Sequence, residues 1–434
     1  MNAGLLVFIL LLLLSFLGIP IFISLGIGTL IALNMADLPM LVLPQKLFAG
    51  MNSSSLLAIP FFILAGNLMS RSITGKLIDV ANALIGRIKG SLALVTGVAS
   101  GLFGAISGSS AATLSSVGSI MAPKLRDRGY PRGVIAALLA SSSVLGLLIP
   151  PSAAQILYAW SSGTSVLACF LATIVPGILV AILFCIVQHF QVRSLKSIED
   201  ATPEKMDMNF GAVMKRTGHA IPALLMPVIV LGGIYGGYLT TMEAAAVAAV
   251  YCVPVAFLFY RGMKFKDLWR TLVEAGYSCG AVAMMLMSCG ILSRIFTTER
   301  IPDLLVSVTM SLTTNKALIM LMINIVMVIL GMLMDDGSAI VLSTPLLLPI
   351  ALSIGVNPVH YAAIMGVNLG MGLVTPPCAP MLFLGAQVAK SPASEAFKPT
   401  MQYILFAWLP TLILTTCIPE LSLWIPHLVL GTPM

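Results

Sequence analysis

Long apolar segments are the feature of this sequence that most limits what it can fold into. Runs of about 18 or more apolar residues, long enough to cross a bilayer as a helix, recur from one end to the other. Only 9% of the 434 residues are charged, against about 25% in an average soluble domain. A transmembrane β-barrel needs short alternating segments instead. The pattern therefore predicts an all-α, polytopic membrane protein embedded in a lipid bilayer.

The N-terminal segment and the net charge both have topological interpretations. Residues 1–33 lack a basic leader and are too long for a signal peptide, so we expect a retained first helix, kinked near Gly18 and Pro20. The formal charge of +7 comes from basic residues that cluster in loops. We interpret it as the cytoplasmic bias of lysine and arginine, and expect no nucleic-acid partner.

The distribution of basic residues also predicts an orientation. If the loop at about 191–217 is cytoplasmic, most of the 23 lysines and arginines fall on that side. The N-terminus is then cytoplasmic and the C-terminus periplasmic. This map requires two segments, at about 91–123 and about 317–353, to enter the membrane and return on the same side. Both carry glycine with hydroxyl or acidic residues halfway along, as expected of a re-entrant hairpin.

Two proline pairs reveal an internal repeat. The stretch GLLIPPSA at 146–153 closely matches GLVTPPCA at 372–379, and the hairpin tips align as Gly108-Ser109 with Gly337-Ser338. Proline inside a helix costs roughly 3 kcal/mol, so we expect broken helices at about 131–160 and about 358–390. The alternative is that each pair only kinks a packed helix. The repeats would span 1–200 and 241–434, and the connecting helix within 201–240 would invert the second repeat.

Inverted repeats with broken helices are typical of secondary transporters. Unwound carbonyls suit a cation, and the helix N-termini at the tips suit an anion. Asp335 has three open interpretations, namely a sodium ligand, a proton carrier or a helix cap, whereas Asp336 is expected to face water. Glu243 is expected to favour the start of a helix. No nucleotide-binding or hydrolase motif is present, so we expect a transporter subunit and no enzyme.

Four stretches together resemble one known family. They are SLLAIPFFILAGNLM (55–69), GGYLTTMEAAAVAAVY (236–251), GMLMDDGSAIVLSTPLLLP (331–349) and GLVTPPCAP (372–380). They are similar to the large membrane subunit (M, DctM-like) of tripartite ATP-independent periplasmic (TRAP) transporters. The resemblance covers essentially the whole chain.

The resemblance implies a bacterial inner-membrane symporter driven by sodium. In this family a small four-helix membrane subunit pairs with the large one, and a periplasmic substrate-binding protein delivers the cargo. The transport domain moves against a scaffold domain as an elevator. The substrates are small organic acids, notably C4-dicarboxylates and sialic acids. Because this sequence starts with the first large-subunit helix, we expect the small subunit to be a separate chain.

The resemblance also implies site residues. The first sodium site would use Ser107, Gly108, Ser109, Ser110, Gly146, Ile149 and Pro150. The second would use Asp335, Gly337, Ser338, Gly372, Thr375 and Pro376. The substrate would contact Ser109, Ser110, Ser338, Pro151 and Pro377. Two positions depart from the family pattern, Ala379 in place of glycine and the second acid Asp336.

Two other functions remain open at this point. One is a stand-alone sodium and organic-anion symporter that needs no binding protein, and the other is an ion channel. The substrate does not follow from the residues, although the hydroxyl-rich tips suit a polyhydroxylated acid such as sialic acid.

Overall fold

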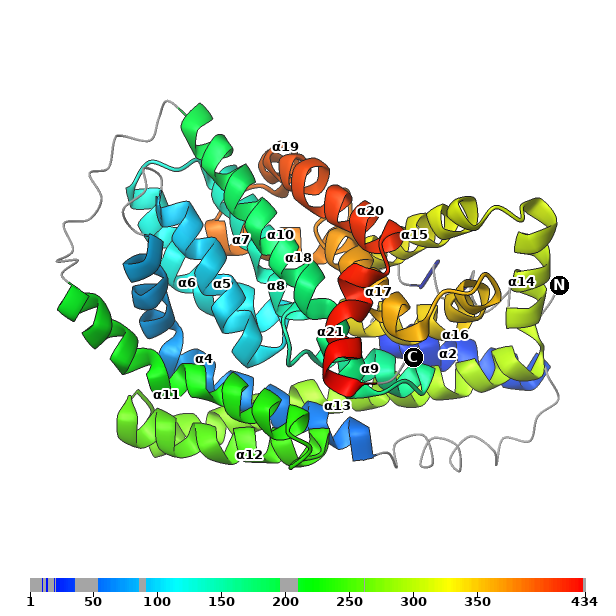
Figure 1. The fold of residues 1–434 in the computed structure, drawn as a ribbon, viewed down its shortest axis with the longest axis horizontal. Coiled ribbons are helices and arrows are strands. Elements are labelled where there is room, and N and C mark those ends of the chain that lie inside the picture. Colours follow the sequence, from blue (N-terminus) through cyan, green and yellow to red (C-terminus); the bar gives the residue numbers. More distant parts are fainter. Residues whose placement is uncertain are drawn as a thin grey trace.

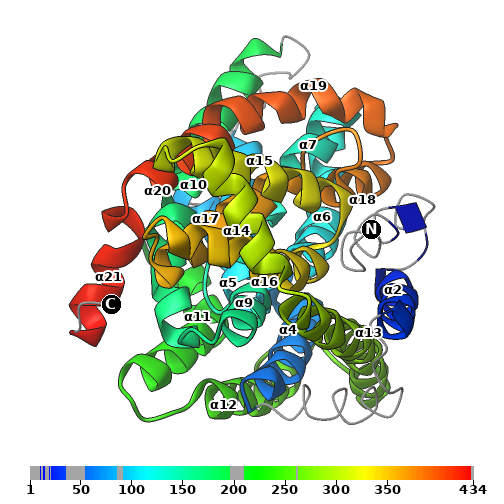
Figure 2. The same ribbon diagram turned by 90° about the vertical axis from the view of Figure 1, so that its right-hand side faces the viewer.

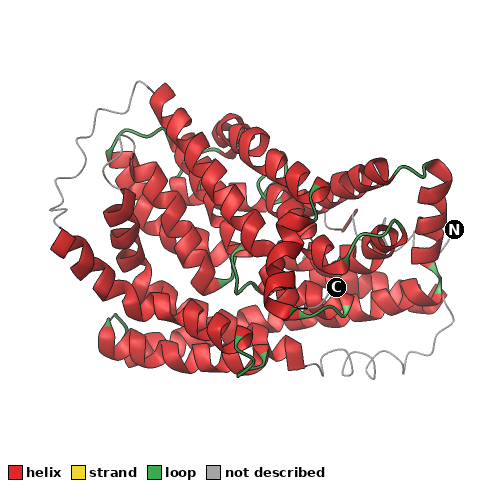
Figure 3. Ribbon diagram, in the orientation of Figure 1, coloured by secondary structure: helices red, strands yellow, loops and turns green. Residues whose placement is uncertain are grey.

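The computed structural model describes residues 21–35, 54–85, 91–195, 210–260 and 262–431, with a few single positions before residue 21. Every regular element in these ranges is a helix (Figures 1 and 3). Six helices are long and apolar enough to cross a membrane, and two bent helix pairs raise the number to eight among the described residues. The prediction of an all-α, multi-pass membrane protein is confirmed. Most of the predicted first helix at 1–33 lies outside the described residues.

One group of long helices lies along one side of the molecule (Figure 1). It comprises α2 (Ile21–Met35), α4 (Ser54–Ile85), α11 (Phe210–Tyr235), α12 (Thr241–Pro254) and α13 (Phe265–Thr298). Helix α4 packs against α11, α12 and α13, and α2 lies beside α13 (Figure 2). Thr240 and Glu243 form a capping box at the start of α12, which confirms the expected role of this acid. We call these five helices the outer group.

The first hairpin and first broken helix follow α4 in the chain. The hairpin consists of α5 (Ser91–Ser107) and α6 (Ser110–Asp127). The broken helix comprises α7 (Arg132–Ser143), α8 (Leu145–Leu148) and α9 (Ala153–Ser162), and its two arms are bent by 47°. Helix α10 (Val166–Ser194) then leads back across the molecule. The predicted bounds of the hairpin and of the broken helix agree with these helices to within a few residues.

The second half repeats this order. The short helix α14 (Ile301–Leu312) precedes a hairpin of α15 (Lys316–Leu333) and α16 (Asp336–Ser353). The second broken helix consists of α17 (Pro358–Gly372) and α18 (Pro380–Ala389). The remaining elements are η1 (Val255–Phe259), which directly follows α12, and at the C-terminal end α19 (Ala393–Tyr403), η2 (Ile404–Trp408), α20 (Leu409–Cys417) and α21 (Glu420–Leu430).

The two halves pack in a reciprocal way. Helix α9, the second arm of the first broken helix, packs on α16 of the second hairpin, and α18 packs on α6 of the first hairpin. Each hairpin also approaches its own broken helix through a glycine pair. A Cβ atom at Gly104 would lie 2.5 Å from Cα of Gly146, and one at Gly372 would lie 2.8 Å from Cα of Gly331. Only glycine permits such close backbone contact.

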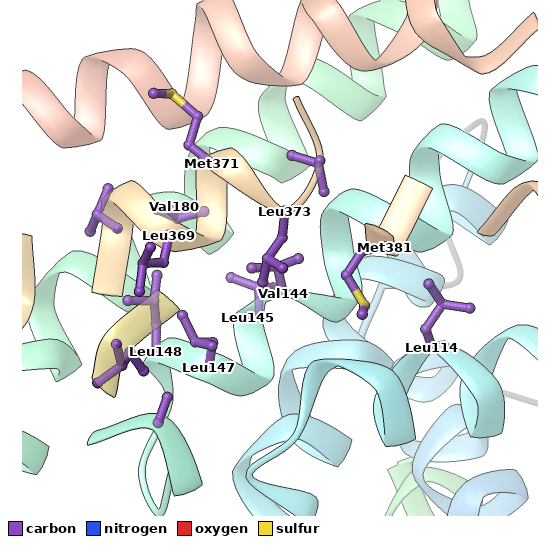
Figure 4. Packing of buried hydrophobic residues seen from close by; sticks show 14 of the residues in the cluster. Leu114, Val144, Leu145, Leu147, Leu148, Val180, Leu369, Met371, Leu373 and Met381 are labelled. Atoms are coloured by element: carbon purple, nitrogen blue, oxygen red, sulfur yellow. The ribbon is translucent and has the colours of Figure 1, made fainter. Parts of the chain in front are cut away.

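Large apolar side chains fill the space where the two broken helices meet. Figure 4 shows Leu373, at the end of α17, beside Val144 and Leu145 at the junction of α7 and α8. Met381 of α18 points toward Leu114 of α6 in the same view. All five belong to the buried core, and such packing holds the broken backbones in place.

The structure corrects one detail of the predicted repeat. Gly337 and Ser338 lie inside α16, so they do not form the second tip. The equivalent of Ser109, which precedes α6 as its N-cap, is Asp335, which precedes α16. The same chain spacing then separates Ser109 from Asp335 and Pro150 from Pro376. The sequence comparison missed this because the two tips share no residue type at the N-cap. The division of the chain into repeats at 200 and 240 stays a prediction.

Candidate functional site

Both hairpin tips line one cavity of about 480 Å³. Ser107, Gly108 and Ser109 contribute the first tip, and Asp335 and Asp336 the second. Residues from α4, α9 and α13 complete the walls. Segments more than half the chain apart in sequence thus meet at one space, whose size suits a small organic molecule.

The first tip is an uncharged turn held by hydroxyl groups. The Thr113 hydroxyl donates to the carbonyl of Ser109 (2.7 Å) and lies 3.1 Å from the Ser107 hydroxyl. The Ser109 side chain accepts from the backbone N–H of Ala112 and so caps α6. Gly108 takes a positive φ of 61°, a conformation that favours glycine. The first turn of α6 holds no acidic residue.

The second tip carries two adjacent carboxylates. Asp335 caps α16 by accepting from the N–H of Ser338 (3.3 Å), and the Ser338 hydroxyl donates to its other oxygen (2.6 Å). Capping, one of the three interpretations of Asp335, is confirmed. Asp336 was expected to face water. It is instead half-buried and lines the cavity. Its Oδ1 accepts from the N–H of Gly337 (3.1 Å).

The first Pro-Pro break contacts the first tip directly. The backbone N–H of Ala153 donates to the carbonyl of Gly108 across a distance of 3.3 Å. A Cβ atom at Gly108 would lie 2.6 Å from the carbonyl oxygen of Pro151. A Cβ atom at Gly146 would lie 3.2 Å from the carbonyl oxygen of Ser109. The first tip and the first break are therefore in direct backbone contact, and the cation site predicted there stays a prediction.

The second break is longer and more internally bonded. The Thr375 hydroxyl donates to the carbonyl of Met371 in the preceding turn (2.7 Å), and the Thr375 N–H donates to the carbonyl of Gly372. The N–H of Met381 donates to the carbonyl of Leu373, on the other side of the break (3.1 Å). Ala379 adopts a φ of 26°, which a glycine would take more easily.

The predicted site residues divide into three sets. The first set lines the cavity: Ser107, Gly108, Ser109, Asp335 and Gly337. The second set is buried behind the tips and consists of Ser110 and Ser338. The third lies at the two breaks, outside the described cavity lining: Gly146, Ile149, Pro150, Pro151, Gly372, Thr375, Pro376 and Pro377.

The sequence analysis missed the wall that the outer group contributes. Asn67 and Ser70 of α4 and Glu274 and Ser278 of α13 line the same cavity as the tips. Glu274 pairs with Arg270 one turn away, at 3.0 Å. An acidic residue within an apolar helix is a signal that could have drawn attention to Glu274. A lone asparagine or serine in such a helix gives no comparable signal.

The fold and this site define a helical membrane protein with two polar hairpin tips that meet at an internal cavity. Residues 7–421 match the family model of the tripartite ATP-independent periplasmic transporter DctM component. The chain therefore belongs to this family of large permease subunits.

Curated relatives match most of this chain. The chain is 36% identical to the C4-dicarboxylate TRAP transporter large permease protein DctM of Pseudomonas aeruginosa, covering 88% of each chain. It is 30% identical to the sialic acid TRAP transporter large permease protein SiaM of Vibrio cholerae, covering 89% and 90%. It is also 36% identical to the isethionate TRAP transporter permease protein DctMQ of Oleidesulfovibrio alaskensis, covering 94% of this chain and 64% of that one.

A solved structure shares the fold. The YdaH transporter of Alcanivorax borkumensis superimposes with a TM-score of 0.58, covering 89% of this chain and 88% of that one at 14% identity. This likeness concerns the fold alone.

Proposed function

We propose that this chain is the permease subunit of a sodium-coupled symporter that imports a small organic acid. The observation that carries the proposal is the single cavity lined by both hairpin tips. The relatives named above are permeases for C4-dicarboxylates, sialic acid and isethionate, all of which are small acids. A small membrane subunit and a periplasmic substrate-binding protein would complete the tripartite system.

Sodium would bind where each tip meets its Pro-Pro break. At the first tip the ligands would be hydroxyl and carbonyl oxygens of Ser107, Ser109 and Gly146. At the second they would include the Asp335 carboxylate. These are hard oxygen donors, which suit an alkali cation. The hydrogen bond between Ala153 and the carbonyl of Gly108 supports a tip and break that act as one unit.

The outer group would act as a scaffold and the two hairpins with the broken helices as the moving elevator. Support comes from the cavity walls, which combine residues of α4 and α13 with residues of the two tips. Glu274 lies one turn from Arg270, which ends a basic loop at about 261–270 that the distribution of lysine and arginine predicts to be cytoplasmic. The cavity would therefore represent the state that releases substrate into the cell.

Uptake into proteoliposomes tests this function. The vesicles would contain this chain with its small subunit, supplied with the matched binding protein and the labelled organic acid that this binding protein holds. Accumulation that requires both an inward sodium gradient and the binding protein is expected. Sodium-driven uptake without the binding protein would favour a stand-alone symporter, and flux without sodium would contradict the proposal.

A further inference from the structure

The charges around the cavity are unequally distributed. None of the described lining residues is lysine, arginine or histidine, although three are acidic: Glu274, Asp335 and Asp336. Glu274 forms an ion pair with Arg270 on the same helix. Both remaining carboxylates belong to the second tip. A doubly anionic substrate would therefore meet a net negative charge on that side of the cavity.

The helix dipole cannot offset this charge. The N-terminus of a helix carries about half a positive charge, while Asp335 and Asp336 together carry two negative ones. Asp335 already caps α16 and holds Ser338, and it would be the ligand of sodium in the proposed function. Even with one sodium ion bound, the second tip keeps a negative charge, located at Asp336.

Asp336 is placed to use that charge on a ligand. It lines the cavity and accepts a hydrogen bond from the adjacent Gly337 N–H. Within the described parts of the chain it has no ion-pair partner. A half-buried carboxylate without a counter-ion is costly because it has lost part of its hydration, and a cationic group of the cargo would compensate it.

The first tip has a partial positive charge, in contrast to the second. Helix α6 starts at the cavity, where Ser109, Ala111 and Ala112 line the wall. Its first turn contains no acid, so its positive end is not neutralised by the protein. A carboxylate or sulfonate would be favoured there, and a sodium ion at the first site would add to this preference.

From the positive end of α6 and the negative charge of Asp336, we infer that the substrate is a zwitterion, an organic acid that also carries an ammonium group. Its anionic group lies at the start of α6 and its cationic nitrogen against Asp336. This inference rests on the proposed function, because it concerns the same cavity. It narrows the substrate class beyond the purely anionic cargoes named for the relatives above.

Matched ligand pairs provide the test. Isethionate and taurine differ only in a hydroxyl against an ammonium group, and so do malate and aspartate. Thermal stability of the purified complex of this chain with its small subunit would be titrated with each compound in sodium buffer. A charge-assisted hydrogen bond predicts that at least one amino compound binds roughly ten- to a hundredfold more tightly than its hydroxyl partner.

Three variants make the test specific to Asp336. Asp336→Asn should abolish the preference for the amino compound, and Asp336→Glu should keep it. Asp303→Asn is the matched control, because Asp303 also lies in the first turn of a helix but outside the cavity lining. It should leave the preference unchanged.

The inference is overturned if neither amino compound stabilises the complex, if the hydroxyl compounds bind equally well, or if Asp336→Asn leaves the preference intact. The proposed function has a separate readout in the stabilisation produced by sodium alone. Loss of the amino preference with sodium stabilisation intact would reject the zwitterion and retain the symporter.

Discussion

The two hairpin tips occupy equivalent places in the fold but differ in charge. Each ends one hairpin helix and caps the next through a side chain, Ser109 before α6 and Asp335 before α16. Each stands beside a broken helix across a glycine pair. The first tip is neutral, whereas the second carries Asp335 and Asp336. Equivalent places in the fold can therefore differ in charge, because single residues at the start of each helix set that charge.

The breaks differ along with the tips. Between α8 and α9 the chain runs from Ile149 to Ser152, and between α17 and α18 it runs from Leu373 to Ala379. The shorter break donates a hydrogen bond to its tip through Ala153, whereas the longer one is bonded within itself through Thr375 and Met381. The acidic tip thus faces a more self-contained break, so its carboxylate would supply the charge for a cation.

The largest expected effect on uptake and stability comes from the close glycine contact that both halves contain. Gly104→Ala and Gly372→Ala should each abolish uptake and lower stability, because overpacking costs about 1–3 kcal/mol and here the contact is with backbone. Thermal unfolding of the purified complex measures this. Gly280→Ala is the control, since nothing lies within 4 Å of a Cβ atom there. Two halves that respond very differently would break the comparison.

The next effect separates the tips by charge. Asp335→Asn should leave α16 capped, because asparagine caps almost as well as aspartate. The sodium concentration for half-maximal uptake should nevertheless rise roughly tenfold or more, since the proposed sodium site would lose its charged ligand. Ser109→Asn, which keeps a neutral cap, should change it far less. Equal sodium dependence in the two variants would contradict a special role for the acidic tip.

A third variant makes the neutral tip resemble the acidic one. Ser109→Asp should preserve stability, because aspartate is a good N-cap. It should weaken uptake of any acid, since two like charges about 6 Å apart repel by roughly 3 kcal/mol at an effective dielectric constant near 20. Concentration dependence of uptake in proteoliposomes measures the change. Unaltered affinity would mean that the anionic group lies elsewhere.

The smallest effect is expected at an acid that caps a helix but lies outside the cavity. Glu243 closes a capping box with Thr240 in the outer group and is exposed. Glu243→Gln can still accept from the Thr240 N–H, so uptake and sodium dependence should match the unchanged protein. A loss of transport comparable to that of Asp335→Asn would show that helix-starting acids matter for folding in general, and would weaken the contrast between the tips.

Much of the architecture was predictable from local patterns. The hairpin expected at about 317–353 is the helix pair Lys316–Leu333 and Asp336–Ser353, and the break expected within about 358–390 falls between α17 and α18. Glycine, proline and polar residues within apolar runs have few interpretations, because backbone groups in lipid must be satisfied internally. The register of the second tip was wrong, since aspartate and serine are both good N-caps and need not align by identity.

The sequence alone determined that this chain is a multi-pass helical protein, where its helices break, and to which family it belongs. The length of apolar segments, the proline pairs and the family motifs are local properties that can be recognised without a three-dimensional structure. The three-dimensional structure was needed to show that Asp336 and Glu274 line the same cavity. Charge balance depends on distances between segments far apart in sequence, because electrostatic interactions act through space and not along the chain.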